Sequence, residues 1–347
     1  MTNPNVRELL RRPVVVAPMA GGPSTVALAI AAAEAGAFTF LAAGYKSVEA
    51  MVAEMAEVRA GRAEPFGVNV FVPGAPANDL DALATYLDTL AADAEAVDAT
   101  LGEPTWDDDQ FDEKISALLA DPPSAVSFTF GCPSPDVVAA FRDAGCAVAV
   151  TVTQPSEAAI AARAGTDALC VQGHEAGAHR GVFTNDGAAA SDLDLLSLIA
   201  KIAEVTDLPQ IAAGGVMRRE QVSAVLAAGA VAAQCGTAFL RCTESGAHPA
   251  YKAALIDPHF TNTVVTRAFS GRPARGLVNR FIVDHADPPC AYPEINNATR
   301  PLRAAAAAHG DVDKMSLWAG VGFRSATDDS AGEVVERLCA PLSGTEL

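Results

Sequence analysis

Residues 172–181 read QGHEAGAHRG and crowd polar and titratable side chains directly behind an apolar run at 168–171. The imidazoles of His174 and His179 can exchange protons near neutral pH, because a free imidazole titrates near ~6.5. Such a group acts as a general acid or base, or binds an anion, whereas a histidine in a loop is more often only solvated. Glycines flank His179 on both sides and leave room for a ligand, so His179 is the candidate catalytic residue.

The spacing of the two histidines disfavours a metal site. His174, Glu175 and His179 superficially resemble the zinc motif HExxH, but the histidines are five residues apart and would not share a helix face. Gly177 would also interrupt a helix here. The seven cysteines are scattered without a CxxC pair, which is typical of reduced thiols rather than of a disulfide framework or a zinc site. We therefore expect no metal.

Glycine-rich turns follow other apolar runs of the chain. One contains Gly214 and Gly215, and the next strand's turn reads QCGT at 234–237. A glycine after a strand is usually only a turn, but paired turns of this kind can cradle a phosphate with backbone N–H groups. The sequence has neither a GxxxxGK[ST] motif nor a GxGxxG motif behind a strand. A phosphorylated ligand bound at the two turns is therefore predicted.

The elements that must position these residues alternate regularly. Ala- and Leu-rich segments with helical spacing separate short, nearly continuous apolar runs, which are typical of parallel strands covered on both faces. The predicted strands are 13–17, 38–42, 66–70, 125–128, 147–151, 168–171, 210–212 and 231–234. Eight such units predict an α/β fold, a (β/α)₈ TIM barrel, rather than a doubly wound sheet. Barrel enzymes place their chemistry at the carboxyl ends of the strands, where the turns and the histidine loop would meet.

Two segments lie outside the eight units, an insertion after the third strand and a C-terminal helical extension. We expect 13–73 and 122–255 to form the barrel, and 74–121 and 256–347 to form a smaller second domain. This domain either covers the barrel mouth or packs as a helical layer on the outside. The segments TRAFSGRPARG and SLWAG favour a placement of this domain over the barrel mouth, because they hold polar and aromatic groups that a plain helical cover would not need.

Composition limits the partners of the protein. The chain has 347 residues, half of them apolar, and 42 Asp and Glu against 24 Lys and Arg, a formal net charge of −18. This balance is globular and offers no basic surface for nucleic acid or an anionic membrane. Without a visible signal sequence or an uninterrupted membrane-spanning stretch, we expect a cytoplasmic protein. Its oligomeric state, monomer or homodimer, stays open.

The same segments resemble the first, bacterial-type class of the nitronate monooxygenase family, formerly called 2-nitropropane dioxygenases. The matching segments are 17–47, Asn69, 130–133, 172–181, 212–216, 234–255, 266–281 and 316–320. The resemblance implies a barrel that holds FMN non-covalently and oxidises alkyl nitronates, such as propionate 3-nitronate, with O₂ to the carbonyl compound and nitrite or nitrate. Neither NAD(P)H nor a metal is implied.

The resemblance also assigns the site residues. The histidine of the family's EAGGH motif falls on His179, the implied catalytic residue. The implied flavin contacts are Met19, Asn69, Gln172, Gly177, Gly214, Gly215, Gln234, Cys235, Gly236 and Thr237. Two positions depart from the family pattern. Ala178 replaces the second glycine of EAGGH and is strained if the backbone there has a positive φ, and Val321 replaces a glutamine near the substrate.

The chemical nature of a nitronate agrees with the flavin contacts and the histidine that the resemblance implies. A nitronate is an electron-rich anion that gives an electron readily to oxidised flavin, and the redox chemistry belongs to the cofactor. His179 would hold the charge of the nitronate or deprotonate a neutral nitroalkane. Two alternatives stay open: an FMN-dependent NAD(P)H enoyl reductase on the same barrel, and a non-catalytic flavin-binding barrel. Anaerobic NADH would bleach the flavin of the reductase but not of the oxidase.

Overall fold

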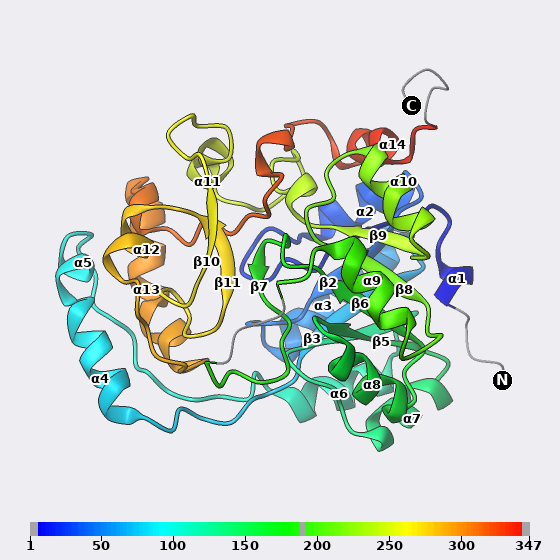
Figure 1. The fold of residues 1–347 in the computed structure, drawn as a ribbon, viewed down its shortest axis with the longest axis horizontal. Helices are drawn as coiled ribbons and strands as arrows, with labels where there is room; N and C mark the ends of the chain where they lie inside the picture. The colour runs from blue at the N-terminus through cyan, green and yellow to red at the C-terminus, as the bar shows by residue number, and fades with distance from the viewer. Residues whose placement is uncertain (1–5, 188–191, 342–347) are drawn as a thin grey trace.

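A closed parallel barrel is the central feature of the computed structural model, which describes residues 6–187 and 192–341 (Figure 1). Its strands, in spatial order, are β1 (Val14–Val16), β2 (Phe38–Ala42), β3 (Phe66–Phe71), β4 (Ala125–Thr129), β5 (Ala147–Val152), β6 (Ala168–Gln172), β8 (Gln210–Ala213) and β9 (Ala232–Cys235). β1 pairs in parallel with both β2 and β9, which closes the ring. The predicted barrel and its eight strand segments are confirmed.

Alternate residues of the strands face two different apolar environments. On β5, Val148 and Val150 belong to the core between strands and helices, whereas Ala147 and Ala149 belong to a cluster inside the barrel. Val6 of the short helix α1 (Val6–Leu9) packs against that inner cluster, which is built from residues at the amino ends of the strands. The amino end of the barrel is thus filled with apolar side chains.

Helices surround the barrel strands. They are α2 (Val26–Glu34), α3 (Val48–Ala60), α6 (Phe111–Ala120), α7 (Pro135–Asp143), α8 (Pro155–Ala164), α9 (Leu195–Ala203) and α10 (Arg219–Ala227). The last helix, α14 (Ala331–Cys339), contacts α2 and α10 and adds its apolar side chains to the barrel core (Figure 1). A distant part of the chain therefore completes the helical layer.

A second group of elements has its own hydrophobic core. It comprises α4 (Leu80–Thr89), α5 (Ala91–Glu95), α11 (Pro249–Ala254), β10 (Thr263–Thr266), β11 (Ala274–Leu277), α12 (Arg280–Asp284), α13 (Glu294–His309) and the short 3₁₀ turns η2 (Val312–Lys314) and η3 (Phe323–Ser325). Leu83 and Leu90 of the insertion share this core with Phe269 and Leu302 of the extension. In Figure 1, α4 and α5 lie beside α12 and α13, away from the barrel.

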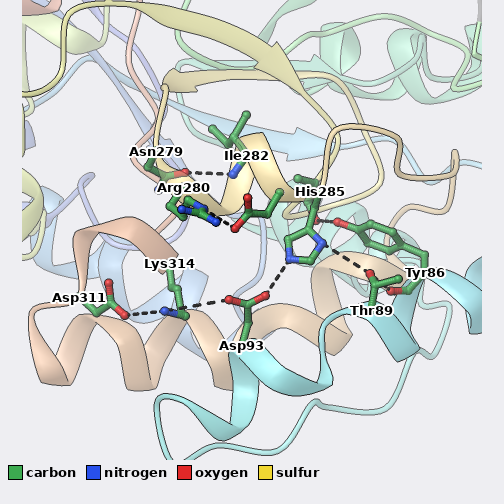
Figure 2. Close-up of polar contacts among 11 residues, drawn as sticks. Tyr86, Thr89, Asp93, Asn279, Arg280, Ile282, His285, Asp311 and Lys314 are labelled. Carbon is green, nitrogen blue, oxygen red and sulfur yellow. Dashed lines mark hydrogen bonds and ion pairs between the residues drawn. The ribbon is translucent and has the colours of Figure 1, made fainter.

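Polar contacts also join the insertion to the extension (Figure 2). His285 Nε2 lies 2.7 Å from Asp93 Oδ2. Lys314 Nζ lies 4.0 Å from the other oxygen of Asp93 and 3.0 Å from Asp311 Oδ2. The two segments are thus packed against one another, although the domain boundaries near residues 73, 121 and 255 stay a prediction.

A small antiparallel sheet connects this second group to the barrel. Its order is β10-β11-β7, and β7 (Ala178–His179) comes from the loop after β6. His179 pairs with Ala274 and Ala178 pairs with Arg275, both on β11. The backbone of the candidate catalytic histidine is therefore held by the C-terminal extension. Among the described residues, no helix is long and apolar enough to cross a membrane.

Candidate active site

A cavity of about 610 Å³ lies at the carboxyl ends of the barrel strands. Small-molecule sites commonly have volumes of about 300–1,000 Å³. All the site residues that the sequence analysis named line this cavity: Met19, Asn69, Gln172, Gly177, His179, Gly214, Gly215, Gln234, Cys235, Gly236 and Thr237. The fold thus brings together, from the carboxyl ends of five barrel strands, every candidate that the motifs indicated.

Two glycines show why the cavity wall needs residues without a side chain. Gly215 has a φ of +65°, in the left-handed region that other residues rarely adopt. A Cβ added to Gly177 would lie 2.5 Å from the backbone nitrogen of Gly320, so the two backbones approach too closely for alanine. The LWAG segment of the extension is therefore seated directly against the histidine loop. Thr237 Oγ1, which accepts a hydrogen bond from Gly320 N–H at 3.0 Å, ties it to the barrel as well.

Side-chain amides fix the walls of the cavity. Gln172 donates from Nε2 to the carbonyl of His179 at 3.0 Å and accepts at Oε1 from Gly181 N–H at 2.8 Å. Asn69 is buried and donates from Nδ2 to the hydroxyl groups of Ser127 and Thr129. Gln172 is an implied flavin contact, but both polar atoms of its side-chain amide are hydrogen-bonded to the backbone of the histidine loop.

The imidazole of His179 is enclosed by aromatic rings. The ring centroids of Phe130, Tyr292 and Trp318 lie 5.7, 5.7 and 5.6 Å from that of His179. Its Nε2 lies 2.9 Å from Oγ of Ser270, a residue with no exposed surface. These contacts fix both the position and the rotation of the ring.

Positive charge surrounds this histidine. The buried guanidinium of Arg272 stacks 4.1 Å from the centre of the Phe130 ring, and Arg300 and Arg303 line the cavity. Among the described residues, none of these three arginines has a carboxylate within the 4.0 Å of an ion pair. In a chain with a net charge of −18, a group of unpaired cations at a cavity indicates a site for an anion.

The protonation state of His179 follows from these surroundings. Burial, together with the charges of Arg272 and Arg303, lowers its pKa to about 3. The expectation from the sequence, a group that titrates near ~6.5, is therefore corrected: the imidazole is neutral at physiological pH. It cannot supply a positive charge to a ligand, and the arginines take that role.

The sequence analysis did not single out Tyr45, which lines the cavity. Its hydroxyl lies 3.0 Å from that of Tyr292, and burial raises the pKa of both groups. Its backbone has a φ of +66° and donates from N–H to Asp109 Oδ1 at 2.9 Å. Asp109 in turn pairs with the buried Lys114 at 2.8 Å. No local pattern marks this arrangement, because Tyr45 and Asp109 are distant in sequence.

Ser270, Arg272, Arg300 and Arg303 were missed as well. The first two lie in the TRAFSGRPARG segment, whose polar groups were noted without individual roles. Arg300 and Arg303 offered a usable signal, because residues three apart on a helix share a face and here neither has a nearby carboxylate on that face.

His174 and Val321 lie outside the cavity lining. His174 Nδ1 lies 3.1 Å from the carbonyl oxygen of Leu193. Val321 has a side chain that is 48% exposed, and its N–H donates to the carbonyl of Glu175 at 3.1 Å. No cluster of three His, Cys, Asp or Glu side chains suited to a metal occurs in the part of the chain that the structure describes.

Comparison with known proteins decides the family. The family described as nitronate monooxygenase matches residues 3–341. The nitronate monooxygenase of Pseudomonas aeruginosa is 39% identical over 352 residues, which cover 96% of this chain and 97% of the relative. The chain belongs to the nitronate monooxygenase family. The family is flavin-dependent, and its members are oxidoreductases.

Other comparisons agree with this family. The probable nitronate monooxygenase of Bacillus subtilis (strain 168) is 35% identical, covering 95% of this chain and 96% of the relative. The solved nitroalkane oxidase from Streptomyces ansochromogenes is 47% identical with a TM-score of 0.92, covering 96% of each chain. FabK from Thermotoga maritima is 24% identical with a TM-score of 0.70, covering 96% of this chain and 94% of that one, and shares the fold alone. The enoyl reductase alternative therefore has only a distant structural neighbour.

Ala178, which replaces a glycine of the family's EAGGH motif, has a φ of +61°. Because the left-handed conformation strains alanine, Ala178→Gly is expected to raise the free energy of unfolding by about 0.5–1 kcal/mol. Urea denaturation measures this change. The control Ala176→Gly, at a negative φ, should lower the stability instead, and a destabilised Ala178→Gly variant would contradict the strain.

The low pKa of His179 predicts a flat pH dependence for the nitronate monooxygenase reaction. The ring is neutral above roughly pH 4, so kcat/KM for a preformed nitronate should show no limb from His179 between about pH 5 and 9. A bound anion favours the imidazolium, so any such limb should appear at higher pH in kcat than in kcat/KM. Rate profiles at constant ionic strength measure both. A kcat/KM limb near ~6.5 that disappears in His179→Asn would refute the prediction.

Proposed function

We propose that the protein binds FMN non-covalently in this cavity and oxidises alkyl nitronates with O₂ to the carbonyl compound and nitrite or nitrate. The observation that carries the proposal is the set of unpaired arginines beside a neutral, buried imidazole. This arrangement suits a small organic anion in a water-poor site, which is the chemical nature of a nitronate.

The cavity fits the cofactor. The backbones at Gly214 and Gly215, with φ of +133° and +65°, and at Gly236 form a cradle without side chains, which suits a phosphate. Met19, Asn69, Gln172 and Gly177 would lie along the flavin ring, and the backbone of 234–237 would complete the phosphate site. Cys235 would contribute only its backbone, because its side chain is buried in the barrel core. When bound, the flavin accepts electrons from the nitronate and passes them to O₂.

The residues of the chain bind and orient the substrate. Arg303 donates from Nε and Nη2 to Thr299 and Asn296 on its own helix, which fixes the guanidinium at the cavity. Arg272 adds charge from behind the ring of Phe130. In a site of low polarity these charges attract an anion more strongly than they would in water. The neutral ring of His179, which lines the same cavity, would lie beside the bound nitro group.

Neutral nitroalkanes are a second candidate substrate. A neutral imidazole has one nitrogen with a lone pair, and His179 can therefore take a proton from the carbon next to the nitro group. The relative from Streptomyces ansochromogenes, which is 47% identical, is described as a nitroalkane oxidase. We propose this deprotonation as an entry step ahead of nitronate oxidation.

The spectrum of the purified protein tests the proposal. A yellow protein that releases FMN on denaturation, is bleached anaerobically by a nitronate and recovers with O₂ would support it. Rapid anaerobic bleaching by NADH would instead support the enoyl reductase alternative. A flavin that responds to neither would support a non-catalytic flavin-binding barrel, and a colourless protein that cannot be reconstituted with FMN would refute the proposal.

The role of His179 is tested by substitution. His179→Asn should lower the rate of turnover of neutral nitroalkanes by about 10²–10⁴-fold, the usual contribution of a general base, while FMN stays bound. Oxidation of preformed nitronates should survive better, because their carbon is already deprotonated. Steady-state rates with both substrates measure the difference.

His174→Asn is the matched control. His174 lies in the same loop but outside the cavity lining, and it contacts the carbonyl of Leu193. Its substitution should leave both rates near those of the wild type. If His174→Asn is the crippled variant and His179→Asn the active one, the assignment of roles within the loop is wrong.

A further inference from the structure

Ser270 connects the catalytic histidine to the C-terminal extension. It lies in the connection between β10 and β11, directly ahead of Gly271, and has no exposed surface. A Cβ added to Gly271 would lie 2.1 Å from the carbonyl oxygen of Ala291, so the turn is closely packed. The hydroxyl of Ser270 is thereby held against His179 Nε2 at 2.9 Å.

The hydrogen bonds of Ser270 determine which nitrogen of the neutral His179 imidazole carries the proton. Its Oγ lies 3.1 Å from the carbonyl oxygen of Arg272 and accepts from the N–H of Arg272 at 3.3 Å. A hydroxyl has one proton to donate and two lone pairs to accept with. If Ser270 donates its hydroxyl proton to the carbonyl of Arg272, one lone pair of Oγ accepts from the N–H of Arg272 and the other from His179 Nε2–H. Every one of these polar groups then has a partner.

The opposite arrangement leaves a buried group without a partner. If Ser270 donated to His179 Nε2, the carbonyl of Arg272, a residue only 2% exposed, would lose its donor. Buried backbone carbonyls are rarely left unpaired, so the first arrangement is favoured. A neutral imidazole that carries its proton on Nε2 has its lone pair on Nδ1. Among the described residues, Nδ1 of His179 has no protein partner, and the ring lines the cavity.

We infer that Ser270 is a positioning residue, which holds His179 as the Nε2–H tautomer and so makes Nδ1 the base toward neutral nitroalkanes. In the step that it supports, the carbon–hydrogen bond next to the nitro group breaks and its electron pair moves into the nitro group. The proton forms an N–H bond with Nδ1. The products are a nitronate anion and an imidazolium, whose charges lie side by side. The inference rests on the proposed entry of nitroalkanes into the reaction.

Nuclear magnetic resonance tests the tautomer without any turnover. In the ¹⁵N-labelled holoenzyme, two-bond ¹⁵N–¹H correlations distinguish the Nε2–H from the Nδ1–H form, and the signal of His179 is the one missing from His179→Asn. We expect the Nε2–H pattern in the wild type at pH 7. An Nδ1–H pattern there would overturn the inference, whatever the variants do. Since this measurement uses no substrate, it stays informative even if nitronates are not oxidised.

Substitution of Ser270 tests the functional consequence. Ser270→Ala removes the acceptor of Nε2–H, so the ratio of kcat/KM for nitroalkane to that for nitronate should fall at least about tenfold, within the range of a lost general base. Ser270→Cys keeps a weak acceptor of similar size and should recover part of that ratio. In Ser270→Ala, the His179 signal should lose the pure Nε2–H pattern.

A matched control separates this role from a general loss of packing. Thr166 is also buried and donates from its hydroxyl to a carbonyl, that of Ala161 at 3.1 Å, at the turn between α8 and β6. Thr166→Val should leave the substrate ratio and the His179 signal unchanged. Equal losses with both substrates in Ser270→Ala, with the Nε2–H pattern retained, would show a purely structural role and overturn the inference.

Discussion

An imidazole buried among unpaired arginines is the constraint on which the site depends. Protonation of His179 would combine the cost of desolvation with repulsion from Arg272 and Arg303, so the ring is held neutral with a pKa of about 3. The same positive charge remains unbalanced until an anion enters the cavity. The protonation state of the histidine and the anion site that we propose therefore have one electrostatic cause.

Holding like charges together requires a stiff frame, and much of it comes from outside the barrel. Tyr86 of α4 donates to the carbonyl of Ala268, two residues before Ser270, and Phe269 stacks on Phe281 in the second hydrophobic core. Apolar burial in this core offsets the cost of the charges that it positions. In this member of a flavin-dependent family, the ring of His179 is thus anchored by a separate group of elements outside the barrel.

The insertion supports the wall of the cavity through a contact that its sequence does not reveal. Its acidic stretch at 102–114, GEPTWDDDQFDEK, has the composition of a solvated polar chain, and many of its residues are exposed. One of its carboxylates, Asp109, nevertheless binds the backbone of Tyr45 and pairs with the buried Lys114. Burial raises the pKa of Asp109, and its bond to Lys114 opposes that shift. An ion pair inside the protein therefore shapes the mouth of a strongly acidic chain.

Short-range patterns were sufficient for the strands, for the glycine turns and for the histidine loop. Continuous apolar runs and glycines at positive φ, such as Gly36 and Gly165, are consequences of local sterics and hydrophobicity, which each segment carries in its own residues. The lowered pKa of His179 and its contact with Ser270, 91 residues away, were decided by the tertiary structure. A residue type has no fixed burial or neighbouring charge, because only the folded chain brings distant groups within a few ångströms and removes water from between them.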